Sequence, residues 1–183
     1  GNPMPPKPWK TLSSRSIYKN PWTNIREDIA EMPNGKTTIY GVVECADCVG
    51  VLPFVDDHHV VLVRQFRYVF GENNRWEMPT GGVKSGETIL EAAHRELREE
   101  SGFDAARLDP VCVYYPSKSI VREVAHLFIG RDLVHVHELP DQTEFFEIQT
   151  FPFEQVVQMV NDSEIRDSMS VIAILHAART LGL

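Results

Sequence analysis

Residues 81–103 read GGVKSGETILEAAHRELREESGF. This stretch joins a glycine-rich loop to one predicted helix, and it is the most informative segment of the chain. The loop ends at Gly86, and residues 87–101 predict a helix with apolar or neutral packing positions. Those positions are Thr88, Ile89, Leu90, Ala92, Ala93 and Leu97. Gly102 stands where a helix C-terminus favours a left-handed residue, so we expect the helix to stop there.

Three acids of this helix share one face. Glu96, Glu99 and Glu100 are neighbours because they are spaced i, i+3 and i+4. Carboxylates roughly 5–6 Å apart repel by about 3 kcal/mol per pair at an effective dielectric of about 20. A hard divalent cation such as Mg²⁺ or Mn²⁺ would offset this repulsion, and Arg95 could orient the acids. The alternative is an acidic helix face that is simply solvated.

The same stretch fits the spacing G-x5-E-x7-R-E-(apolar)-x-E-E-x-G-(apolar) and resembles the signature of the Nudix hydrolases. The matching residues are Gly81, Glu87, Arg95, Glu96, Leu97, Glu99, Glu100, Gly102 and Phe103. The resemblance implies an α/β/α sandwich with a mixed sheet. It also implies metal-dependent hydrolysis of a phosphorus-containing anhydride.

Composition limits the classes of protein. The 183 residues are 43% hydrophobic, enough for a globular core, and the net charge of −8 disfavours nucleic acid or an anionic membrane as partner. No apolar run approaches the length of about 20 residues that spans a bilayer, and we expect no secretory leader. Residues 1–3 are interpreted as a cloning remnant before Met4. Residues 4–44 are predicted to form an N-terminal strand extension, and residues 45–183 the hydrolase domain.

Three cysteines indicate a reducing compartment such as the cytoplasm, without a disulfide framework. Cys45 and Cys48 form a C-x-x-C pair. We interpret both as partly buried strand residues, with a zinc site as the alternative. Cys112 is expected in the core.

The remaining pattern predicts an α/β layered domain, because strands alternate with three helices. Residues 9–44 predict exposed antiparallel strands with a hairpin turn at Asn34-Gly35. Near-continuous apolar runs predict buried strands over 48–55 and 59–70. We further expect strands at 111–116, 123–130 and 144–151, a long loop at 131–143, and helices at 153–160 and 168–181.

Outside the signature, the chain resembles the nucleoside diphosphate sugar branch, which includes hydrolases of ADP-ribose and GDP-mannose. The segments that carry this resemblance are 61–67 (VLVRQFR), 76–82 (WEMPTGG, with Thr80 where alanine is usual) and 171–173 (VIA). Residues 115–119 read YPSKS and lack the proline-glycine pair common in ADP-ribose members. The sequence therefore favours broader use of nucleoside diphosphate sugars over strict ADP-ribose preference.

Candidate substrate contacts follow from this reading. Arg67, with Arg64 second, could bind the diphosphate oxygens, unless they are surface arginines on an edge strand. Glu77 is a further candidate, because it lies in the segment WEMPTGG that carries the resemblance to this branch. By resemblance, Trp22 and Tyr18 are candidates to stack on the base, with packing or dimer contact as the alternative. The resemblance also implies a homodimer in which the N-terminal extension is exchanged.

The mechanism requires metal ligands and a general base. Glu96, Glu99 and Glu100 are the predicted ligands, joined by the backbone carbonyl of Thr80, and Glu99 and Arg95 are also expected to serve catalysis. Glu87 should act through Arg95, unless it is only a favourable acid at a helix N-terminus. Candidates for the base, by resemblance, are Glu144 first, then Asp141, Glu138 and Glu147.

Two other functions stay open. Relatives with the same signature cleave dinucleoside polyphosphates, coenzyme A or damaged nucleoside triphosphates. A Nudix-fold sensor would instead bind a nucleotide sugar without cleaving it, but such sensors tend to lose acids from the signature. All of the acids are present here.

Overall fold

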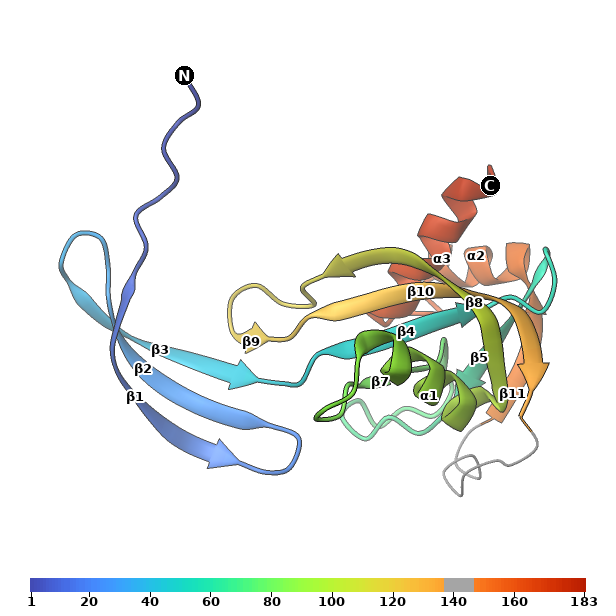
Figure 1. The fold of residues 1–183 in the computed structure, drawn as a ribbon, viewed down its shortest axis with the longest axis horizontal. Helices are drawn as coiled ribbons and strands as arrows, with labels where there is room; N and C mark the ends of the chain where they lie inside the picture. Colours follow the sequence, from blue (N-terminus) through green and yellow to red (C-terminus); the bar gives the residue numbers. More distant parts are fainter. Residues whose placement is uncertain (137–146) are drawn as a thin grey trace. The chain divides into compact units, whose positions relative to one another are not determined.

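The computed structural model describes residues 1–136 and 147–183. Contacts between residues divide the chain into two compact units (Figure 1). The N-terminal unit contains residues 1–46 and 115–123, and the C-terminal unit contains residues 47–114 and 124–183. None of the helices in the described ranges is long and apolar enough to cross a membrane.

The N-terminal unit is one four-stranded sheet in the order β1-β2-β3-β9. Its strands are β1 (Lys10–Lys19), β2 (Asn24–Glu31), β3 (Thr37–Glu44) and β9 (Val121–Arg122). The predicted antiparallel pairing and the hairpin turn at Asn34-Gly35 are confirmed, because β2 pairs with β3 and Gly35 has a φ of 81°. The expected exposure is wrong for β2, which is half-buried with Asp28 and Ala30 buried, because it lies between β1 and β3 in the sheet. Every residue of β1 is exposed, in keeping with its polar-rich sequence.

In its described residues, the C-terminal unit holds two sheets and three helices. Its strands are β4 (Cys48–Pro53), β5 (His59–Arg64), β6 (Trp76–Glu77), β7 (Thr80–Gly82), β8 (Phe103–Tyr114), β10 (Ala125–His135) and β11 (Glu147–Pro152). Its helices are α1 (Ile89–Ser101), α2 (Phe153–Asn161) and α3 (Ser168–Thr180). The sheet orders are β7-β4-β10-β8 and β11-β5-β6. β4 and β10 are parallel while the other pairs are antiparallel, so the predicted mixed sheet is confirmed.

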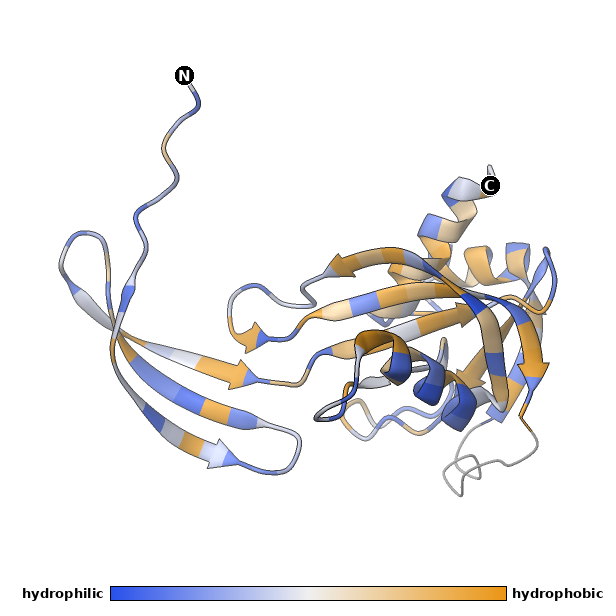
Figure 2. Cartoon of the chain, in the orientation of Figure 1, coloured by the Kyte–Doolittle hydropathy of each residue, from blue (hydrophilic) through white to orange (hydrophobic). Residues whose placement is uncertain are grey.

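The helices cover the central strands from two sides, and each side has its own apolar core. Ala92, Ala93 and Leu97 of α1 pack against Val49 and Val51 of β4. On the other side, α2 and α3 pack against residues of β4, β5 and β10, among them Leu52, Leu62 and Leu127. Successive strand residues point to opposite faces, so one strand supplies both cores. This α/β/α layering is the predicted one (Figures 1 and 2).

Helix α1 is defined by signals in its own sequence. The Thr88 side chain accepts a hydrogen bond from the Glu91 N–H, and the Glu91 side chain accepts one from the Thr88 N–H. This capping box starts the helix at Ile89, so the expected start at Glu87 was wrong by two residues. Gly102 ends it in the left-handed region, with a φ of 73°, as predicted.

Several predicted boundaries need correction. The expected strand over residues 59–70 ends at Arg64, because the chain then turns back on itself: the Arg67 N–H donates to the Glu72 carbonyl oxygen, and Gly71 has a φ of 64°. The expected loop at 131–143 begins as strand, since β10 runs to His135. Residues 137–143 of that loop and 144–146 of the expected strand lie outside the described residues.

Of the cysteines, Cys48 lies in β4, but Cys45 lies in the connection before it and not in a strand. No disulfide joins any two of the three cysteines, and each is half-buried. Cys112 packs against the core from β8, as expected.

Candidate active site on helix α1

The three predicted metal-binding acids lie close to the loop that precedes α1. Glu100 is buried, and its Oε2 accepts a hydrogen bond of 3.1 Å from the Thr80 N–H. Glu96 and Glu99 are mostly buried, and each accepts a hydrogen bond from Arg95 Nη1, at 2.7 Å and 3.2 Å. The structure thus brings all three carboxyl groups to the side of α1 that faces β7.

Gly81 is needed for this arrangement because the Glu96 carboxyl group lies directly over its backbone. A Cβ added at Gly81 would come within 2.1 Å of Glu96 Cδ. The neighbouring Gly82 has open space at the same place. The first glycine therefore leaves room for a functional side chain, and the second has no such role.

Arg95 joins the acids to the loop. Its Nε and Nη2 donate to the two carboxylate oxygens of Glu87, at 2.6 Å and 2.9 Å, and Nη2 also donates to the Gly82 carbonyl oxygen at 2.9 Å. The predicted contact of Glu87 with Arg95 is present. Hydrogen bonds from Arg95 lower the pKa of Glu87 to about 2. Glu87 thus holds the guanidinium group, which in turn contacts Glu96 and Glu99.

Burial makes negative charge costly at this site. The pKa of Glu100 is raised to about 9, first by burial and then by the charge of Glu96. Burial also raises the pKa of Glu96, although Arg95 opposes the shift. A cation beside these carboxyl groups would favour their charged forms.

The donor set suits a divalent metal ion in chemistry, since hard cations prefer carboxylate and carbonyl oxygens. In the part of the chain that the structure describes, no three His, Cys, Asp or Glu side chains are already grouped to hold an ion. The reason is visible in the hydrogen bonds: Arg95 holds Glu96 and Glu99, while Thr80 holds Glu100. Glu100, buried without an ion-pair partner among the described residues, is the group that a metal ion would compensate.

The two predicted phosphate-binding arginines have different surroundings. Arg67 is half-buried and forms a two-point ion pair with buried Glu77 of β6. Arg64 ends β5, pairs with Glu147 of β11 and lies over the ring of Trp76, 4.5 Å from its centre. Arg67 reaches a pocket that also contains Thr80, whereas Arg64 does not line that pocket.

This pocket has a volume of about 400 Å³ and brings in residues that the sequence did not single out. Besides Arg67, Glu77 and Thr80, it is lined by Phe70, Glu72, Arg75, Arg166, Asp167, Ser168 and Met169. The last four surround the start of α3. The pattern Asp167-x-x-Ser170 signals a helix N-terminus, but nothing in the local sequence places it beside β6 and β7.

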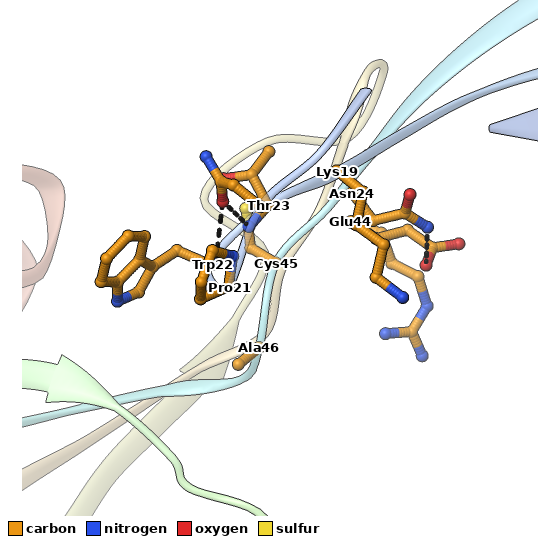
Figure 3. Close-up of a pocket in the computed structure, with 10 residues that line it drawn as sticks. Lys19, Pro21, Trp22, Thr23, Asn24, Glu44, Cys45 and Ala46 are labelled. Carbon is orange, nitrogen blue, oxygen red and sulfur yellow. Dashed lines mark hydrogen bonds between the residues drawn. The ribbon is translucent and has the colours of Figure 1, made fainter. Parts of the chain in front are cut away.

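Trp22 and Tyr18 belong to the N-terminal unit. Trp22 is 80% exposed and lines a pocket of about 590 Å³ together with Lys19, Glu44, Cys45 and neighbouring residues (Figure 3). Tyr18 is also exposed, but it does not line that pocket. Of the two aromatic candidates, Trp22 is therefore the one in a concave site.

The candidate bases Glu144, Asp141 and Glu138 lie outside the described residues. Glu147, the fourth candidate, is at the start of β11 and pairs with Arg64.

Comparison with known proteins gives the family. The NUDIX domain model matches residues 46–170, about two thirds of the chain. The chain belongs to the Nudix family. Its residues 9–43 match a second family model, the nucleoside diphosphate sugar hydrolase N-terminal domain. The protein is therefore a Nudix pyrophosphohydrolase of the branch expected from the sequence, and Nudix enzymes generally use a divalent metal ion.

This Nudix protein is similar to individual known proteins along most of its length. It is 29% identical to the ADP-ribose pyrophosphatase of Bacillus subtilis, over 91% of both chains. It is 26% identical to the methanol dehydrogenase activator of Bacillus methanolicus, again over 91% of both chains. The crystal structure of an ADP compounds hydrolase matches with a TM-score of 0.85 at 21% identity, covering 98% of this chain and 97% of that chain, and supports the fold.

Proposed function

We propose that this protein hydrolyses the diphosphate bond of nucleoside diphosphate sugars such as ADP-ribose and GDP-mannose. The products are a nucleoside monophosphate and a sugar phosphate. The observation that carries the proposal is the acid cluster of α1, held by Arg95 and Glu87 beside a pocket with its own arginines. The similarity to an ADP-ribose pyrophosphatase along 91% of both chains supports ADP-ribose as one substrate.

Glu96, Glu99 and Glu100 would hold Mg²⁺, or Mn²⁺ in its place, together with the carbonyl oxygen of Thr80. A bound ion would stabilise the negative charge that develops on the diphosphate and increase the acidity of a bound water molecule. The protein's part is to keep the carboxyl groups together against their repulsion. Arg95 does this for Glu96 and Glu99, and the Thr80 N–H does it for Glu100.

Arg67 would bind the diphosphate. Its Nε and Nη2 are held by Glu77, whereas Nη1 has no hydrogen bond to any described residue. A guanidinium group fixed by a buried carboxylate is oriented before the substrate arrives, so less conformational entropy is lost on binding. Arg64 is the second candidate. To bind the diphosphate it would have to break its ion pair with Glu147 or contact both groups at once.

We keep Glu144 as the first candidate for the general base, with Asp141, Glu138 and Glu147 as its competitors. Replacing each by glutamine in turn would separate them. The variant that lacks the true base should show a kcat lower by about 10²–10⁴-fold, the usual contribution of general base catalysis, with little change in KM.

The N-terminal extension, residues 4–44, would contribute to a homodimer, with Trp22 as a stacking surface for the base. The exposed ring of Trp22 in its pocket supports this role. We place the enzyme in the cytoplasm, where its three cysteine thiols would remain reduced.

A product assay with Mg²⁺ tests the function. Its substrates are ADP-ribose, GDP-mannose, a dinucleoside polyphosphate, coenzyme A and a nucleoside triphosphate. Release of AMP with ribose phosphate, or of GMP with mannose phosphate, supports the proposal. Pyrophosphate released from the triphosphate alone would refute it, and binding of ADP-ribose without any product would favour a sensor.

A further inference from the structure

The pocket beside α3 contains one arginine that no carboxylate of the described residues neutralises. Arg67 pairs with Glu77, and Arg75 pairs with Glu72. Arg166 has no ion-pair partner among the described residues, and its Nε donates only to the carbonyl oxygen of Ser163, at 2.8 Å. Its remaining N–H groups suit a phosphate oxygen.

Asp167, the next residue, offers an acceptor to the same pocket. Its Oδ2 accepts hydrogen bonds from the backbone N–H and the hydroxyl group of Ser170, at 3.0 Å and 2.9 Å. No other described residue donates a hydrogen bond to Oδ1. An ionised carboxylate accepts hydrogen bonds but cannot donate them, so its natural partner is a ligand N–H or O–H group.

Buried Ser170 holds this carboxylate in position. Ser170 is fully buried, and its hydroxyl oxygen accepts the N–H of Met78 at 2.9 Å. Met78 lies between Glu77 of β6 and Thr80 of β7, so Asp167 is connected to the chain segment that approaches the acid cluster. The side chain of Asp167 is solvent-accessible, yet protein surrounds it on most sides, and this desolvation raises its pKa. Both observations agree with a group on the wall of a concave site.

We propose that Asp167 determines specificity by accepting a hydrogen bond from a sugar hydroxyl group of the substrate, with Arg166 beside it on a phosphate oxygen. The inference rests on the proposed function and deepens it. A sugar phosphate carries hydroxyl donors and phosphate acceptors on adjacent atoms, which matches an adjacent carboxylate and free guanidinium group. The pocket reaches Thr80, whose N–H contacts Glu100, so a ligand there would lie next to the cleaved bond.

Asp167 also caps α3, and that role alone could explain its presence. Serine caps helices about as well as aspartate but has no carboxylate. D167S therefore separates the two roles, and D167N serves as a second variant that keeps both the cap and the shape. D162N, at the exposed end of α2, is the matched control outside the pocket.

The experiment compares wild type, D167S, D167N and D162N on three substrates with Mg²⁺. These are ADP-ribose, an ADP-ribose analogue lacking both hydroxyl groups on the adenosine ribose, and an ADP methyl ester lacking the terminal sugar. For ADP-ribose, D167S should lose roughly 10- to 100-fold in kcat/KM, the range for a hydrogen bond to a charged group. Its melting temperature should match that of wild type, and D162N should behave as wild type.

The analogues identify the sugar. If the terminal sugar supplies the hydroxyl group, the penalty of D167S disappears with the methyl ester; if the adenosine ribose supplies it, the penalty disappears with the dideoxy analogue. No penalty on ADP-ribose, or an equal penalty on all three substrates, overturns the inference. Wild-type turnover judges the proposed function separately. A wild-type protein that neither cleaves nor binds ADP-ribose would overturn both.

Discussion

The carboxyl group of Glu96 occupies the space that a side chain on Gly81 would fill, since a Cβ there would lie 2.1 Å from Glu96 Cδ. The backbone of β7 and the side chain of the helix thus fit together closely at the proposed metal site. The contact makes an inconspicuous glycine as important as the acid itself.

G81A should inactivate the enzyme while leaving it folded. The three atoms nearest to the added methyl group all belong to the flexible end of Glu96, so the cost in stability should be small. Displacing a metal ligand by about 1 Å can cost about 100-fold in rate, and we expect a loss of that size in kcat/KM. G82A is the matched control, because its Cβ meets nothing within 4 Å. Equal activity of the two variants would contradict the proposed role of Glu96.

E100Q should decrease kcat by orders of magnitude. It should also weaken Mg²⁺ binding, which calorimetry measures with a nucleotide sugar present. Glutamine keeps the size of the side chain and the hydrogen bond to Thr80, so the fold should survive. E91Q is the control on the same helix, because glutamine also completes a capping box. Near-normal turnover of E100Q would refute the metal assignment.

Stability in acid should depend on Glu87. Its pKa is about 2 in the folded protein and 4.5 ordinarily, so its ion pair with Arg95 stabilises fully above pH 4.5 and is lost as the pH falls toward 2. The free energy of unfolding of wild type should therefore fall more steeply over this range than that of E87Q. Denaturant titrations at several pH values measure both slopes. If the free energy of unfolding depends on pH in the same way for wild type and E87Q, the ion pair between Glu87 and Arg95 does not contribute to stability.

S170A should destabilise the C-terminal unit by about 1–3 kcal/mol, because the buried N–H of Met78 loses its acceptor. Chemical denaturation measures the loss. S168A is the control: Ser168 bonds only the Tyr114 hydroxyl group at the surface, and its removal should cost less than about 1 kcal/mol. A loss of stability in S168A as large as that in S170A would argue against the proposed contribution of the hydrogen bond between Met78 and Ser170.

The predicted strand over residues 59–70 was too long for an identifiable reason. Residues 66–70 are largely apolar, and the pattern alone extended β5 through them, but Phe66, Tyr68, Val69 and Phe70 are exposed. The chain leaves the sheet at Arg64 because Arg67 pairs with Glu77 and the backbone turns at Gly71. An apolar pattern shows only that a segment can be buried. The ion pair between Arg67 and Glu77 joins residues ten positions apart, so a local pattern does not reveal it.

Local sequence determined helix α1 and its chemistry. The capping box of Thr88 and Glu91, the stop at Gly102 and the shared face of Glu96, Glu99 and Glu100 all involve residues within four positions of each other, where helix geometry leaves little choice. The tertiary structure alone decided what surrounds them. Ser170 meets Met78 across 92 positions of sequence, and this contact brings Asp167 to the pocket. Such a contact depends on how packed layers meet, which no local pattern encodes.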